Sequence, residues 1–209
     1  MALGPIIRSM FGRHEAAVAN LYRSIFIDLD AYIAQVVKWV PAPRRILEVG
    51  AGEGAVTERL ARAFPLAEIV AIDITPRVGR LYKGRQERVT FLQKTVQDMA
   101  VEQPGGFDFV ILSDVIHHVP TALRSAIIAA LRGCLASDGL LVFKDWAEDR
   151  TVIHWLCKTS DVYLTGDDVS YLDAPKLEAL IETGFGAKTI VDRATIAPWR
   201  NNFAMLVRG

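Results

Sequence analysis

The chain has 209 residues, 51% of them hydrophobic and 23% charged, which is enough for one domain with a substantial core. Lysine plus arginine equals aspartate plus glutamate at 24 each, so the overall charge gives no basis for binding nucleic acid or an anionic membrane. No stretch approaches the ~18 apolar residues of a membrane span, and the start of the chain lacks signal-peptide features. Cys134 and Cys157 form no CxxC pair and are expected to be free thiols in a cytoplasmic, soluble protein.

The N-terminal part is predicted to be helical. Apolar residues recur at helical spacing from His14 to Val40, with a break expected near residues 28–30. Pro41 and Pro43 then end the helical pattern and lead into the first strand. Such helices either pack against a sheet or lie over its open binding site, and the sequence leaves both interpretations open.

From residue 44 onward, short apolar strands alternate with helical segments, a pattern typical of a parallel sheet with right-handed crossovers. The last two strands are joined by residues 197–202, a connection so short that they must be antiparallel. Residues 145–173 are the least periodic part, where functional variation is expected. The expected strands are 46–49, 68–74, 89–92, 107–112, 139–144, 187–196 and 203–207, and the expected helices are 55–64, 122–135 and one from the N-cap Asp173 to Gly184.

Residues 44–57, RRILEVGAGEGAVT, are the most informative stretch. An apolar strand runs into three glycines at alternate positions, Gly50, Gly52 and Gly54, and then into a helix. A strand, glycine turn and helix in this order bring backbone N–H groups and a helix N-terminus to one point. The stretch therefore predicts a small-molecule site.

The glycine spacing alone fits two kinds of cofactor. Gly50, Gly52 and Ala55 satisfy the relaxed dinucleotide pattern, with Asp73 at a suitable distance to hold a ribose. Glu48 argues against a pyrophosphate, because repulsion in a low-dielectric cleft should cost on the order of a kcal/mol or more. A ligand with an ammonium or sulfonium group would instead be favoured by that acid.

These residues resemble the class I S-adenosylmethionine-dependent methyltransferases. ILEVGAGEG matches the glycine motif of the family, including its acid, and Asp73 in IVAIDI matches the acid that ends the second strand. FDFVILSDVIHHV, residues 107–119, is similar to the fourth-strand motif. The antiparallel C-terminal hairpin matches the seventh-strand insertion that separates this family from dehydrogenases. The resemblance covers residues 44–209.

The resemblance implies an α/β fold, a doubly wound, mostly parallel seven-stranded sheet with the last strand antiparallel. One methyltransferase domain is expected over residues 1–209, with an N-terminal helical cap at 1–43 and a Rossmann-like core at 44–209. The implied cofactor is S-adenosylmethionine and the implied acceptor a small molecule, with a preference for an oxygen in a biosynthetic pathway. No nucleic-acid or membrane partner is expected, and a homodimer is compatible with the sequence.

The resemblance also implies a set of cofactor-binding residues, with one departure. The acid that contacts the adenine amino group in the family falls at Thr95, and Asp98 lies three residues further on. Either Thr95 and the Val96 backbone make the contact with the adenine amino group, or a shifted loop brings Gln97 or Asp98 to it. The predicted set is Glu48, Gly50, Ala51, Gly52, Asp73, Ile74, Thr95, Val96 and Ser113.

Three residues are candidates for a general base, in the order His118, His117 and Asp145. Both histidines follow the fourth strand, and imidazole is the natural proton acceptor near neutral pH. The alternatives are packing for His118, and neutralisation of Asp145 by Lys144 or Arg150. No metal site is predicted.

Two further segments are candidates for substrate contact, and two other functions compete with methyl transfer. His154, Trp155 and Tyr163 would line a substrate pocket, and residues 199–202 form either a simple hairpin tip or a contact with substrate or a second subunit. The competing functions are a nucleotide-dependent oxidoreductase and a non-catalytic, methyltransferase-like binding subunit.

Overall fold

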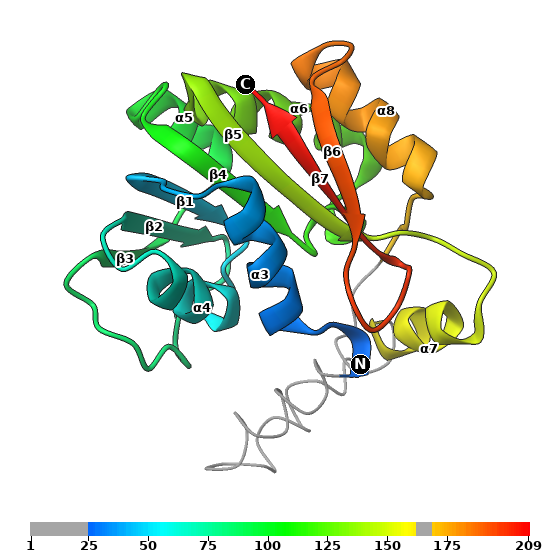
Figure 1. Cartoon of the computed structure of the whole chain (residues 1–209). Coiled ribbons are helices and arrows are strands. Elements are labelled where there is room, and N and C mark those ends of the chain that lie inside the picture. The colour runs from blue at the N-terminus through cyan, green and yellow to red at the C-terminus, as the bar shows by residue number, and fades with distance from the viewer. Residues whose placement is uncertain (1–24, 162–168) are drawn as a thin grey trace.

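The computed structural model describes residues 25–161 and 169–209 (Figure 1). The expected helix before residue 25 and the predicted contact of Tyr163 therefore lie outside the described residues. No helix in the two described ranges is long and apolar enough to cross a membrane.

A seven-stranded sheet forms the centre of the fold, in the order β3-β2-β1-β4-β5-β7-β6. The pairs from β3 to β5 are parallel, and β7 is antiparallel to both β5 and β6. The predicted doubly wound topology and the antiparallel hairpin are confirmed. The strands are β1 (Arg45–Val49), β2 (Glu68–Asp73), β3 (Val89–Gln93), β4 (Phe107–Ser113), β5 (Leu135–Trp146), β6 (Ile190–Thr195) and β7 (Asn202–Arg208).

Helices cover both faces of the sheet (Figure 1). Alternation along β4 shows why, because Val110 and Leu112 pack on one face while Phe109 and Ile111 pack on the other. The first face is covered by α5 (Val96–Glu102), α6 (Thr121–Cys134) and α8 (Ala174–Phe185), and the second by α3 (Leu29–Trp39) and α4 (Ala55–Ala63). The 3-10 turn η2 (Ile116–His118) follows β4, and α7 (Val152–Ser160) follows β5.

The predicted break in the N-terminal helical region is present at Asp28. Its side chain accepts hydrogen bonds from Asp30 N and Ala31 N at 3.0 and 2.9 Å, and so caps α3. Residues 25–28 thereby leave the helix axis and run toward the carboxyl ends of the central strands, where Phe26 and Ile27 line a cavity.

Two predicted boundaries were wrong. The strand expected at 139–144 begins at Leu135 instead, and residues 137–139 form a bulge inside β5, since the register with β4 jumps from Phe107↔Leu135 to Phe109↔Leu140. Gly184 does not end its helix, because α8 continues to Phe185 and Gly186 is the C-cap. The glycine is needed at 184 because a Cβ there would lie 2.4 Å from Ile128 Cγ2 on α6.

Helices α5 and α7 were not predicted. Helix α5 has only 7 residues, too few to show a periodic face. In α7 the usual pattern is inverted, since Val152 and Trp155 are exposed while His154 and Cys157 are buried. Apolar periodicity therefore could not identify either segment.

Candidate functional site

The glycine turn that follows β1 requires glycine for two different reasons. Gly50, Gly52 and Gly54 all have positive φ, at 79°, 50° and 91°. Gly50 also has no room for a side chain, because a Cβ would lie 2.3 Å from Val115 Cγ2. Gly54 is the N-cap residue of α4, so the helix N-terminus opens at the turn as predicted.

Asp73, at the carboxyl end of β2, holds the turn in place. Its Oδ2 accepts a hydrogen bond from Gly52 N at 2.8 Å, and its Oδ1 accepts from the backbone N–H and the hydroxyl of Thr75, each at 2.8 Å. A carboxylate offers about four acceptor positions. Asp73 can therefore support the turn and still accept hydrogen bonds from a ligand hydroxyl.

Glu48 is a buried acid directly beneath the glycine turn. Only 4% of its surface is exposed, and its Oε2 has no hydrogen-bond partner. Burial raises the pKa of this carboxyl to about 8, with Thr57 opposing the rise in part. A buried, unpartnered carboxyl oxygen is costly, so this atom is suited to a ligand group that donates a hydrogen bond or carries positive charge.

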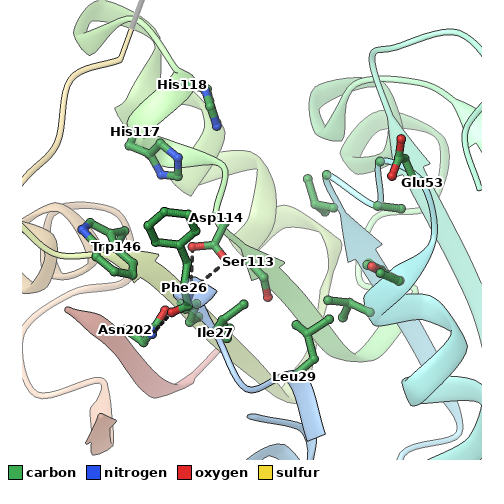
Figure 2. A pocket seen from close by; sticks show the side chains of 18 of the residues that line it. Phe26, Ile27, Leu29, Glu53, Ser113, Asp114, His117, His118, Trp146 and Asn202 are labelled. Atoms are coloured by element: carbon green, nitrogen blue, oxygen red, sulfur yellow. Dashed lines mark hydrogen bonds and ion pairs between the residues drawn. The ribbon is translucent and has the colours of Figure 1, made fainter. Parts of the chain in front are cut away.

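A cavity of about 450 Å³ connects the glycine turn with the residues after β4 and β5 (Figure 2). Figure 2 shows the two histidines, Asp114 and Trp146 on one side of it and Glu53 on the other. Of the predicted site residues, the cavity wall contains Glu48, Gly50, Ala51, Gly52, Ser113, His117 and His118. Asp73, Ile74, Thr95, Val96 and Asp145 are not on its wall.

Thr95 and Asp98 form the N-terminal cap of α5, which explains the departure noted in the sequence. Asp98 N donates to Thr95 Oγ1 at 3.1 Å, while the Asp98 carboxylate accepts from the Thr95 hydroxyl at 2.7 Å and from its N–H at 3.2 Å. The cap lowers the pKa of Asp98, mainly through the Thr95 hydrogen bonds. The Asp98 carboxylate therefore lies beside Thr95. These two residues, which were named in the two alternatives for the adenine contact, are hydrogen-bonded to each other.

His117 and Asp145 form a buried pair. His117 Nδ1 bonds Asp145 Oδ1, and the His117 backbone N–H donates to Asp145 Oδ2 at 3.2 Å. Asp145 Oδ1 also accepts from Trp146 N at 2.7 Å. An ionised carboxylate only accepts hydrogen bonds, so Nδ1 carries the proton and Nε2 is left as the basic atom.

Each member of this pair favours the charged form of the other. Burial lowers the pKa of His117, but the charge and hydrogen bond of Asp145 outweigh burial, and the pKa is raised overall. Burial would raise the pKa of Asp145, yet the His117 charge and hydrogen bond hold it below its usual range. The sequence left open whether Lys144 or Arg150 neutralises Asp145, and in the structure its hydrogen-bonded side-chain partner is His117.

Lys144 has a different partner. Its Nζ lies 2.7 Å from both carboxylate oxygens of Asp114, and its side chain is only 1% exposed. Asp114 has a φ of 55° and donates its N–H to Lys144 O at 2.9 Å. One atom from each of Asp114, His117 and Asp145 lies within 4.8 Å of the others. The oxygens of these carboxylates hold Lys144, His117 and Trp146 N–H.

An aromatic wall supports the His117 ring. Tyr171 stacks on it with ring centroids 4.9 Å apart and an interplanar angle of 12°, and its hydroxyl bonds Asp161. The His118 ring is 4.1 Å from that of His117, but His118 is exposed. Phe26 meets Trp146 edge to face at 5.8 Å. Sequence reasoning did not identify Asp114, Phe26 and Tyr171 as parts of the site, since only their positions in space connect them.

The predicted substrate-side segments have distinct positions. His154 Nδ1 accepts from Trp146 Nε1 at 3.0 Å, so it supports the wall rather than forming it, and Trp155 is 63% exposed. At the hairpin tip, Trp199 Nε1 donates to Ile25 O at 2.6 Å and Asn202 Nδ2 to Phe26 O at 2.6 Å. The tip therefore holds residues 25–26 against the cavity.

Comparison with known proteins connects this site with a family. A family model described as a methyltransferase domain matches residues 47–141. A ubiquinone biosynthesis O-methyltransferase from Xanthomonas campestris pv. campestris is 39% identical over 101 residues, 46% of this chain and 41% of that protein. One from Xanthomonas euvesicatoria pv. vesicatoria is 38% identical over 104 residues, 48% and 42% of the two chains. The chain thus matches less than half the length of these curated relatives.

Solved structures share the fold over nearly the whole chain. The 1,6-didemethyltoxoflavin-N1-methyltransferase of Burkholderia thailandensis has a TM-score of 0.69 and 18% identity, covering 98% of this chain and 87% of that one. A possible histamine N-methyltransferase from Thermotoga maritima has a TM-score of 0.65 and 15% identity, covering 96% and 98%. The methyltransferase-domain match over residues 47–141, the strand order and the glycine turn all agree with the resemblance to class I S-adenosylmethionine-dependent methyltransferases.

Proposed function

We propose that this protein transfers a methyl group from S-adenosylmethionine to a small-molecule acceptor, and that the acceptor atom is an oxygen. The observation that carries the proposal is the buried His117–Asp145 pair, whose imidazole opens on the same cavity as the glycine turn. A hydroxyl needs to lose its proton as it attacks a methyl group, and this pair is built to accept one.

The residues around the glycine turn fit the cofactor. The buried Glu48 Oε2 lacks a partner and lies where a cationic amino-acid group would satisfy it, and Asp73 retains acceptor positions for ribose hydroxyls. The Gly50, Ala51 and Gly52 backbone forms the adjoining wall. When bound, the cofactor supplies an electrophilic methyl group on a sulfonium.

His117 performs the proton transfer in this mechanism. Asp145 holds the imidazole in the tautomer with the proton on Nδ1, and Nε2 accepts the proton of the acceptor hydroxyl. The negative charge of Asp145 then stabilises the imidazolium, while Tyr171 keeps the ring from rotating. His118 was ranked first from the sequence, but it is exposed, whereas His117 is buried against Asp145, and His117 is therefore the stronger candidate.

The remainder of the cavity aligns the acceptor and excludes water. Its volume of about 450 Å³ suits a small molecule, and Phe26 and Trp146 provide apolar surface for one with an aromatic or partly apolar ring. The similarity to ubiquinone biosynthesis O-methyltransferases over 101 residues supports oxygen as the acceptor.

A two-step experiment tests the proposal. S-adenosylhomocysteine should raise the melting temperature, while NAD and NADP should not, because ligand binding stabilises the folded state by mass action. Stabilisation by a nicotinamide cofactor alone would instead support an oxidoreductase. Isotope-labelled S-adenosylmethionine is then incubated with matched phenol and aniline pairs that differ only in the acceptor atom. Transfer to the phenols is expected, and cofactor binding without transfer to either series would support a binding subunit.

A further inference from the structure

Two consecutive residues of β5 place opposite charges at the candidate base. Lys144 reaches Asp114, in the loop after β4, while Asp145 reaches His117 in the next turn of the same loop. Successive residues of a strand point to opposite faces, which explains how neighbours in sequence reach two different partners. The loop from Asp114 to His117 is thus held at both of its ends by β5.

The four groups are close enough to influence one another. Oxygen atoms of Asp114 and Asp145 and a nitrogen of His117 lie within 4.8 Å, and Lys144 Nζ is 2.7 Å from both Asp114 oxygens. Two carboxylates therefore adjoin one imidazole. The Lys144 ammonium hydrogen-bonds Asp114, the carboxylate that does not hold the ring, and its charge also acts on Asp145. At such distances an unpaired carboxylate strongly favours a protonated imidazole.

We propose that Lys144 is a positioning residue for the candidate base: by neutralising Asp114, it limits the negative charge around His117 and leaves the imidazole able to accept a proton. The inference rests on the proposed function for its catalytic meaning. The coupling of charges that it describes can be measured without any activity.

The sum of charges gives the direction of the effect. With Lys144 and both carboxylates ionised, the group carries one net negative charge when His117 is neutral and none when His117 is protonated. Without the lysine charge, the group would keep a net charge of minus one even with His117 protonated. His117 would therefore bind its proton more firmly. Removing the Asp114 charge would have the opposite effect.

Substitutions at Lys144 and Asp114 leave the other charged and aromatic residues around His117 unchanged. Tyr171 stacks on the ring, His118 lies beside it, and Asp161 adds negative charge from the end of α7. Arg124 of α6 interacts with the charge of Asp145, and its pKa is lowered mainly by burial. The facing groups from the neighbouring elements are therefore Asp114, His118, Arg124, Lys144, Asp145, Asp161 and Tyr171.

The test is an NMR titration of the His117 imidazole in the full chain. Only 4 histidines are present, so His117 can be assigned with single substitutions of the others. Lys144→Met should raise the His117 pKa by about 1 unit or more, and Asp114→Asn should lower it. Asparagine tolerates the left-handed backbone at position 114, so the second variant keeps the loop conformation.

The double variant, Lys144→Met with Asp114→Asn, removes both charges and should return the His117 pKa to near the wild-type value. Lys188→Met is the control, since this exposed lysine lies just before β6, at the end of the sheet opposite to His117. Shifts below about 0.3 unit in both folded single variants, or shifts of the same sign, would overturn the proposal. If Lys144→Met does not fold, Asp114→Asn and the double variant still decide it.

Activity separates this inference from the proposed function. The pH profile of methyl transfer should move to higher pH in Lys144→Met and recover in Lys144→Arg, which keeps the charge. If the NMR shifts occur but the pH profile does not follow, the coupling stands and the role of His117 as base is wrong. If neither moves, Lys144 has no positioning role.

Discussion

The Gly50 φ of 79° and the 2.3 Å separation between its virtual Cβ and Val115 Cγ2 show that the glycine turn and the loop after β4 are fitted against each other. Val115 lies between Asp114 and the histidine turn. The two halves of the site, one predicted for the cofactor and one for the acceptor, thus share a direct contact.

Gly50→Ala should therefore disturb both halves. The left-handed backbone costs alanine about 1 kcal/mol, and the contact with Val115 adds to that cost. We expect a lower melting temperature and weaker S-adenosylhomocysteine binding by calorimetry. Adding Val115→Ala should restore part of the loss, since it removes the clash and leaves the backbone strain. An undiminished loss in the double variant would show that the contact is unimportant.

Asp73→Ala should weaken S-adenosylhomocysteine binding more than any other substitution at the turn. Hydrogen bonds to charged groups contribute about 1.5–3 kcal/mol, so a loss of at least about 10-fold in affinity is expected. Asp73→Asn keeps one acceptor oxygen and should lose less. Isothermal titration provides the comparison, with Asp108→Asn, at the opposite end of β4, as the control. Equal affinity in wild type and Asp73→Ala would refute the assigned role.

Glu48 predicts a pH dependence of both stability and ligand binding. Its folded pKa of about 8 lies above the ordinary value of 4.5, so its contribution to stability is fully present below about 4.5 and is lost as pH rises through about 8. The melting temperature of the ligand-free protein should decline across this window, and less so in Glu48→Gln. Binding of the cationic ligand favours the ionised acid, so its affinity should increase over the same window.

His117→Asn should reduce methyl transfer by about 10²–10⁴-fold while leaving S-adenosylhomocysteine binding nearly unchanged. The raised pKa of His117 means that the basic form accumulates only as pH rises through that value. The turnover number of the wild type should therefore increase with pH over this range and then level off. The same measurements on His118→Asn separate the two histidines, and a larger loss there would restore the order predicted from the sequence.

The hairpin tip gives a prediction with a closely matched control. Asn202→Ala removes the hydrogen bond to Phe26 O, whereas Asn201→Ala removes one to Ala147 O. We expect faster hydrogen exchange at residues 25–27 and a higher KM for the acceptor in the first variant. Comparable exchange at these residues in both variants would mean that the tip does not hold the cavity wall.

The geometry of the glycine turn was largely predictable from the sequence, because its residues are contiguous or end a buried strand, while their role in binding the cofactor stays a prediction. Gly50 to Gly54 need no tertiary information to be recognised as a turn, and Asp73 is identified by the apolar strand before it. Thr95 remained ambiguous, because whether Asp98 folds back onto it depends on a helix too short to predict.

The acceptor half was only partly predictable. His117 and Asp145 were recognised as separate candidates, but their pairing joins residues 28 positions apart through the register of two strands. The sequence offered Lys144 only as one possible partner of Asp145, whereas its hydrogen bonds go to Asp114, which lies close to it only in the folded chain. Tyr171 and Phe26 gave no signal, since stacking and edge contacts depend on the packing of distant segments.

The bulge at the start of β5 has a consequence for this charge arrangement. It sets the register of the rest of β5, in which Lys144 pairs with Ser113 of β4 and Asp145 pairs with Phe203 of β7. A deletion of one residue in the bulge would turn every later side chain to the opposite face. Lys144 and Asp145 would then exchange faces, and neither would reach its present partner in the loop after β4. The polarity of the site is therefore encoded some six residues upstream of it, in residues 136–139, which do not line the cavity.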